Sequence, residues 1–148
     1  MKKVFALIMA LTLFALSAGC GAAPKQEVSA EVTEAAAAAT IDIDLAEMSG
    51  TMVYSEVSQI MSDPEAYIGK TIRAKGPFKQ NGGYYFVLIN DATACCAQGL
   101  EFVWAGDHTY PNDYPDVDTE IIVTGKFNSY MEGEDKYYHL ENAALETA

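Results

Sequence analysis

Two adjacent cysteines, Cys95 and Cys96, are the residue types in this chain best suited to chemistry. Thiolates bind Zn²⁺ well, but a structural zinc site takes four ligands, so the pair needs further donors. A disulfide between neighbours is strained, because their Cα atoms lie about 3.8 Å apart whereas disulfides prefer about 4.4–6.8 Å. The pair is therefore a structural pair (two thiols or a strained disulfide), a metal site, or a site of thiol exchange with a partner.

The local backbone and the local charge bear on that choice. An extended backbone points neighbouring side chains to opposite faces, so both sulfurs reach one metal ion only where the segment turns. The small and polar residues at 93–94 and 97–99 favour such a turn. Acidic surroundings raise the pKa of a thiol and lower its reactivity, which weakens the thiol-exchange interpretation.

Motifs of known catalytic sites are missing from the sequence. It contains no nucleophile elbow, no HExxH, no phosphate-binding glycine loop and no CxxC. Paired carboxylates can be found anywhere in so acidic a chain, so they carry no information. The sequence therefore predicts a protein that is not an enzyme.

The N-terminus has the pattern of an export signal. Basic residues at 1–3 precede an apolar run of about 13 residues, which is shorter than the ~20 that a membrane span needs. The run ends in "LSAGC", which resembles the lipobox of bacterial lipoproteins and implies cleavage after residue 19 and acylation of Cys20. We therefore expect a lipid-anchored protein on the extracytoplasmic face of the cell membrane; the alternative is an ordinary secretory signal.

Charge excludes one class of partner. Removal of residues 1–19 leaves 7 of the 9 basic residues and all 21 acidic ones, a net charge of −14. Such a surface repels phosphate backbones, so we expect no nucleic acid partner. It suits cations, or an envelope protein with a basic face.

The mature chain divides into a tether and one domain. Residues 20–50 are rich in Ala and Glu, cannot bury a core, and predict a flexible tether after Cys20. Within them "IDIDLAEM" alternates apolar and acidic residues and fits a short edge strand or a docking segment. Residues 51–148 have the apolar content of a folded domain.

Periodicity predicts the elements of that domain. Apolar residues recur at helical spacing over 54–61, and Pro64 opens a second short helix through Tyr67. Five strands follow, over 72–78, 84–90, 100–104, 121–130 and 136–140, with no helix between them. Gly76 and Gly125 each stand inside a strand, two residues before a phenylalanine, where a glycine marks a bend or bulge.

The run "YIGKTIRAKGPF", the strand order and "VDTEIIVTGKFNSY" resemble the OB-fold, as found in uncharacterised bacterial envelope proteins that carry a paired cysteine. The resemblance covers about residues 54–146. It implies an all-β domain, a small five-stranded OB-like barrel with an N-terminal amphipathic helix. The fold name by itself assigns no activity.

This resemblance also suggests partners for the candidate residues. In an OB barrel the third and fifth strands run parallel, which would place Cys95 and Cys96 near the acidic turn 132–135 and make His139 the third ligand. His108 would lie at the far end, ~20 Å or more away. On the face of the second and third strands, the usual ligand platform, Tyr85 and Trp104 are expected to stack on a ligand. Phe102 is expected in the core.

The sequence thus predicts a membrane-anchored, extracytoplasmic binding module for a protein partner or a small ligand. The alternative is a metal-binding or metal-trafficking accessory protein that uses Cys95, Cys96 and His139, with Zn²⁺ as the candidate ion. An acidic loop at 107–118 could hold Ca²⁺, although a solvated loop is the simpler interpretation.

Overall fold

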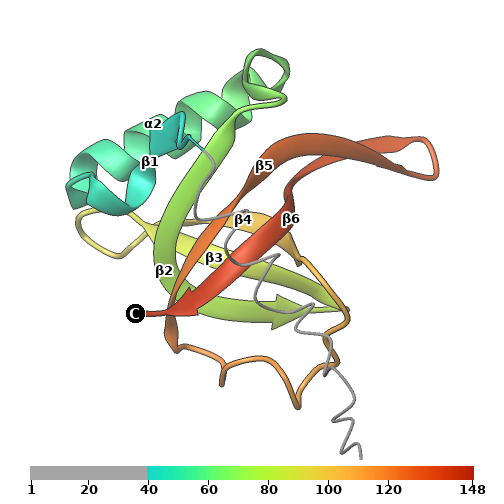
Figure 1. Ribbon diagram of the computed structural model, residues 1–148. Helices are drawn as coiled ribbons and strands as arrows, with labels where there is room; N and C mark the ends of the chain where they lie inside the picture. Colours follow the sequence, from blue (N-terminus) through green and yellow to red (C-terminus); the bar gives the residue numbers. More distant parts are fainter. Residues whose placement is uncertain (1–39) are drawn as a thin grey trace, which may run out of the picture.

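The computed structural model describes residues 40–148, which are mostly β with a single α-helix (Figure 1). The predicted signal peptide, Cys20 and most of the predicted tether lie outside these residues. Within 40–148, no helix is both long and apolar enough to cross a membrane. The prediction of a β-rich domain with an N-terminal helix is confirmed.

The elements follow the chain in the order expected from periodicity. In sequence they are β1 (Ile43–Asp44), η1 (Leu45–Glu47), α2 (Gly50–Ser62), η2 (Pro64–Tyr67), β2 (Thr71–Asn81), β3 (Tyr84–Asn90), β4 (Ala97–Trp104), β5 (Glu120–Glu132) and β6 (Asp135–Thr147). The two 3-10 helices η1 and η2 flank α2, and Pro64 stands at the first turn of η2, where its missing N–H is not needed.

The strands form one six-stranded mixed sheet in which all strands except β1 close into a ring. Its order is β1-β2-β3-β4-β6-β5, and an additional pairing between β2 and β5 closes a ring of hydrogen-bonded strands. Strand β2 makes this possible because its residues 71–77 pair with β5 while its residues 78–81 pair with β3. Strands β4 and β6, the third and fifth strands of the prediction, run parallel as expected.

Gly76 and Gly125 allow the strands to bend and approach each other. A Cβ atom on Gly76 would lie 2.1 Å from the carbonyl oxygen of Leu88. A Cβ on Gly125 would lie 2.9 Å from Cβ of Leu140, and the β5–β6 register shifts between Thr124 and Lys126. Both glycines therefore stand where any larger residue would push two strands apart, and the register shift at Gly125 fits the bend or bulge that the sequence predicted.

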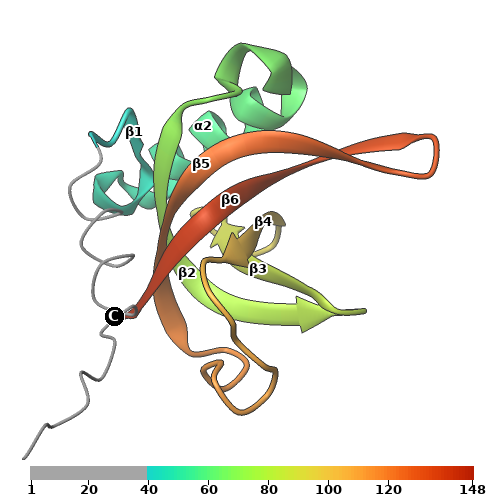
Figure 2. The same cartoon turned by 45° about the vertical axis from the view of Figure 1, so that its right-hand side comes forward.

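The core fills the space between the sheet and α2. Fully buried side chains from every long strand, among them Phe78, Phe102 and Phe127, meet Val57 and Ile60 from the apolar face of α2. Phe102 is only 1 % exposed, so its predicted place in the core is confirmed. The helix contacts β3 and β4, and it lies at one side of the strongly curved sheet in Figures 1 and 2.

The folded part begins before residue 51, the boundary expected from composition. Ile43 and Asp44 pair in parallel with Ile72 and Arg73 of β2, which adds a sixth strand at the sheet edge. Leu45 is 2 % exposed and belongs to the core. The sequence predicted either an edge strand or a docking segment here, and the segment is both: β1 pairs with β2, and Leu45 packs into the core.

The far part of the β5–β6 hairpin, residues 128–139, projects from the sheet (Figures 1 and 2). We call it the arm. Strand β6 pairs with β4 at Leu140 and Ala143, after the arm has returned to the sheet. Within the arm the two strands pair only with each other, from Asn128 opposite His139 to Glu132 opposite Asp135.

Candidate functional site

A tight turn between β3 and β4 positions the two cysteines. Asp91 follows the last residue of β3, and its carboxylate accepts hydrogen bonds from the backbone N–H groups of Thr93 and Cys95. Side-chain capping of this kind is why Asp favours turns. Ala94 adopts a positive φ of 54°, and the N–H of Asp91 donates to the carbonyl oxygen of Cys96 across the turn. The local turn that both sulfurs need in order to reach one metal ion is therefore present.

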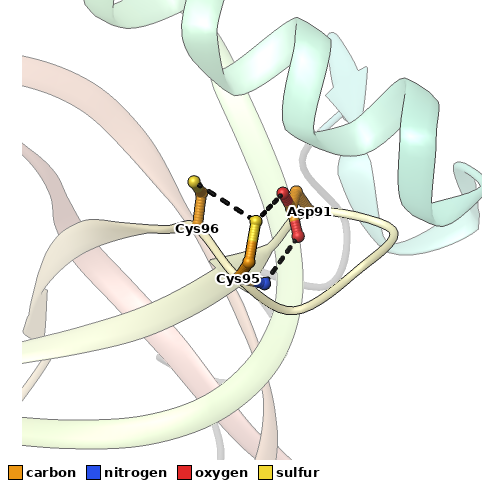
Figure 3. A group of neighbouring side chains, drawn as sticks. All are labelled: Asp91, Cys95 and Cys96. Carbon is orange, nitrogen blue, oxygen red and sulfur yellow. Dashed lines mark hydrogen bonds between the residues drawn. The ribbon is translucent and has the colours of Figure 1, made fainter.

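The turn brings both sulfurs to the same side (Figure 3). The Sγ atoms of Cys95 and Cys96 are 3.6 Å apart, and Sγ of Cys95 is 3.3 Å from a carboxylate oxygen of Asp91. Both thiols are free and exposed. Among residues 40–148, Asp91, Cys95 and Cys96 form the group of potential metal ligands, with donor atoms within 4.8 Å of one another.

Electrostatics in this turn disfavours a reactive thiolate. The hydrogen bond with Cys95 raises the pKa of Cys96 above its ordinary value, and burial and the charge of Asp91 act in the same direction. For Asp91, burial works to raise the pKa, but hydrogen bonds from Cys95 and Thr93 outweigh it and the pKa is lowered. Ionisation of Asp91 is thus favoured, and ionisation of the neighbouring Cys96 thiol is disfavoured.

His139, the predicted third ligand, is not part of this group. It lies on the arm, with its ring stacked on that of Tyr130 at 4.8 Å between centroids. The acidic turn at the arm tip is also elsewhere, because Glu132 accepts a hydrogen bond from the Tyr84 hydroxyl, at the end of β3 opposite to the cysteines. The parallel pairing of β4 and β6 does not bring His139 to the cysteines, because the arm leaves the sheet before it reaches their level.

A second candidate site lies between β3–β4 and the arm. It is a pocket of about 500 Å³ that contains both predicted platform residues, Tyr85 and Trp104. Its walls are mostly aromatic, and they are formed by Gly83, Tyr84, Tyr85, Glu101, Phe102, Val103, Trp104, Gly106, His108, Tyr114, Tyr130 and His139. We call it the aromatic pocket.

Stacked rings build the first wall of the aromatic pocket. The rings of Trp104 and His108 stack at 3.6 Å between centroids, and those of Tyr85 and Tyr114 at 4.2 Å. His108 is held by its Nε2, 3.0 Å from the carbonyl oxygen of Ala105. Burial raises the pKa of Tyr114 to about 12, so this hydroxyl stays neutral at physiological pH.

Polar side chains from β4 and the arm form another part of the lining. The Tyr130 hydroxyl donates to a carboxylate oxygen of Glu101 at 3.0 Å. The other oxygen of Glu101 is 3.8 Å from Nδ1 of His139, too far for a hydrogen bond, and that buried nitrogen has no partner among the described residues. The side chains of Glu101 and His139 are only 13 % and 15 % exposed.

Burial favours the neutral forms of Glu101 and His139. It raises the pKa of Glu101, against the hydrogen bond from Tyr130, and Glu132 raises it further. Burial also lowers the pKa of His139, partly offset by the charge of Glu141. The Glu101 carboxylate, which lacks a counter-charge, therefore stands beside the His139 imidazole, whose Nδ1 has no hydrogen-bond partner among the described residues.

Sequence reasoning missed Asp91 and Glu101 as site residues. Asp91 had a signal, an acid directly after an apolar strand and before a turn. Glu101 had a weaker one, an acid in the otherwise apolar "LEFVW". In the acidic loop, Asp113 accepts from the N–H of Thr109 and Asp118 pairs with Lys79, so these carboxylates hold the loop in place.

The fold and its two sites define a β-rich protein with an aromatic pocket and an exposed pair of thiols. A scan against protein-family models found no match, and a search of curated proteins found none.

Proposed function

We propose that the protein is an extracytoplasmic lipoprotein, anchored through Cys20, whose domain is an OB-like barrel that works as a non-enzymatic binding module. The closed ring of hydrogen-bonded strands and the parallel β4–β6 pairing support the barrel interpretation. We further propose that its ligand is a small molecule bound in the aromatic pocket.

One observation carries this proposal: partly exposed aromatic rings line a pocket of about 500 Å³. Pockets of this size and lining are typical of small-molecule sites. Rings that served only the core would be covered by other side chains, as Phe78 and Phe127 are. Tyr85 and Trp104 instead pack against the core with one side and face the pocket with the other.

Ligand screening by NMR tests the pocket. The purified full chain is titrated with a set of small cations, anions and neutral aromatic or sugar compounds. We expect chemical shift changes at Tyr85 and Trp104, and loss of binding in Trp104→Leu but not in Tyr54→Leu, an aromatic residue of α2 outside the pocket. Binding that is unaffected by Trp104→Leu, or no binding by any compound, would contradict the proposal.

Membrane fractionation tests the anchor. The Cys20→Ala chain is expected in the soluble extracytoplasmic fraction, because a lipobox without its cysteine cannot be acylated. A Cys95→Ala chain is the matched control and should stay with the membrane. Membrane retention of Cys20→Ala would refute the anchor.

A second candidate function is metal binding at the turn. The donor atoms of Asp91, Cys95 and Cys96 within 4.8 Å favour it. Two sulfurs and one carboxylate oxygen fit Zn²⁺, with a fourth position for water or for a ligand from a partner. Exposure of both thiols suits the transfer of an ion to another protein more than permanent storage.

Native mass spectrometry with thiol titration tests the metal site. We expect one Zn²⁺ per chain at micromolar Zn²⁺, with protection of both thiols from alkylation. Asp91→Asn should weaken binding by about tenfold or more, because the ion loses an anionic ligand. His139→Gln should leave it unchanged. Two alkylatable thiols and no bound ion at that concentration would exclude this function.

A further inference from the structure

The lining of the aromatic pocket has a single sign of charge. Glu101 is its one carboxylate, and no Lys or Arg is among the lining residues. The other ionisable groups are two histidines, of which His139 has its pKa lowered by burial, and tyrosines. An anionic occupant would face the Glu101 carboxylate without a counter-charge, so the pocket disfavours it.

The aromatic rings give the pocket a second attraction for positive charge. The face of an aromatic ring is electron-rich and attracts a cation within about 6 Å of its centroid, most strongly for Trp. Trp104, Tyr85 and Tyr130 line the same pocket as Glu101, and the Tyr130 hydroxyl contacts the Glu101 carboxylate. A ring cage with one carboxylate is the arrangement that recognises organic ammonium groups.

The Glu101 carboxylate is also poorly satisfied as it stands. One oxygen accepts from Tyr130, while the other lies 3.8 Å from an imidazole nitrogen that has no partner. Burial without a counter-charge is costly for an anion. A cation in the pocket would supply the charge that the described residues do not.

We propose that the aromatic pocket binds a small organic cation, an alkylated or protonated amine, with Glu101 as its counter-charge and Trp104, Tyr85 and Tyr130 as its ring cage. This inference rests on the proposed binding function and narrows it to one class of ligand. The net charge of the mature chain adds long-range attraction for the same class.

Isothermal titration calorimetry of the full chain with two matched probe pairs tests the charge preference. Choline is compared with its neutral analogue 3,3-dimethylbutan-1-ol, and tyramine with tyrosol. We expect at least one cation to bind about tenfold or more tightly than its neutral partner. Equal binding of both members would overturn the cation inference and leave the binding module standing. If neither pair binds, the cation inference falls, and the binding module falls only if the wider NMR screen is also negative.

Glu101→Gln identifies the counter-charge. The amide keeps an oxygen for the Tyr130 hydroxyl, so the pocket shape is retained, and circular dichroism checks the fold. We expect the cation affinity to fall about tenfold and the affinity of the neutral analogue to stay the same. Glu56→Gln on α2 removes the same charge outside the pocket and should change neither. An equal effect of both substitutions would show that net charge, not the site, attracts the cation.

Discussion

Glu101, the proposed counter-charge of the aromatic pocket, is held by the fold at a cost in stability. Its carboxylate is buried beside an imidazole whose Nδ1 is unpaired, and its pKa is raised. The folded protein keeps the proton of Glu101 to a higher pH than the unfolded chain does. Its stability therefore falls as the pH rises above about 4.5, the ordinary pKa of this group. The ionised residue is therefore destabilising at neutral pH.

We expect Glu101→Gln to stabilise the protein by about 1 kcal/mol at pH 7. The substitution removes the buried charge, and its amide N–H can donate to Nδ1 of His139. The gain should disappear as the pH falls below 4.5, where Glu101 is protonated in both states. Urea unfolding at pH 4 and pH 7 measures it. A loss of stability at pH 7 would show that the carboxylate is well satisfied.

Residue roles were the hardest part to predict from the sequence. The pair Cys95–Cys96 and the proposed platform residues Tyr85 and Trp104 were singled out because their types are distinctive. Asp91 was missed because its role exists only once the turn has formed around it. His139 was joined to the cysteines because an ideal strand would bring it toward them, and the projection of the arm cannot be seen in periodicity.

At the scale of elements, glycines decide whether the ring of strands can close. Gly76 stands near the point where β2 changes partner from β5 to β3, and the carbonyl oxygen of Leu88 fills the space that a Cβ would need. Steric conflict at a backbone atom cannot be relieved by a side-chain rotation, so the strands themselves must move.

We expect Gly76→Ala to lower the free energy of unfolding by about 3 kcal/mol or more. Gly50→Ala, at the start of α2 with no atom within 4 Å of its Cβ position, is the control and should change it by less than about 0.5 kcal/mol. Thermal unfolding followed by circular dichroism compares them. Similar stability of both variants would mean that β2 and β3 tolerate a wider spacing.

The segment before α2 makes a second prediction at this scale. Leu45 is buried, while Ile41, four residues earlier, is 38 % exposed. Leu45→Ala should cost about 3 kcal/mol, because it leaves a cavity under β1 and η1. Ile41→Ala should cost well under about 1 kcal/mol. Equal costs in urea unfolding would show that the segment is not docked in solution.

Most elements could be predicted because their patterns are long. The alternation over β2 and β5 and the helical spacing over α2 span many residues, and both were found. The two-residue strand β1 was predicted only as an edge strand or a docking segment within the tether, because so short a pattern carries little signal. Its docking depends on the burial of Leu45 in the core. Strand ends were underestimated where polar residues continue the pairing, as in the arm.

At the scale of the whole molecule, charge sets which partners can approach. The mature chain has a net charge of −14 on the residues after the predicted cleavage site. The few lysines and the arginine of the domain are largely engaged, since Arg73, Lys75, Lys79 and Lys136 each pair with a carboxylate. Little positive potential remains for polyanions.

We therefore expect no binding of single-stranded DNA, although the proposed OB-like fold is one that often binds it. Fluorescence anisotropy of a labelled 12-nucleotide oligonucleotide should not change at up to about 100 µM protein at low salt, where electrostatic binding is strongest. Binding that weakens as salt is added would contradict the expectation and reveal a basic surface.

The stacking of Trp104 on His108 has a practical consequence. The chain contains one tryptophan, and it forms a wall of the aromatic pocket. Indole emission responds to the polarity and the rings around it, so fluorescence excited at wavelengths that tyrosine does not absorb comes from this one cavity. The molecule thus carries its own optical reporter, and any occupant of the pocket should register as a change in colour or intensity without a label.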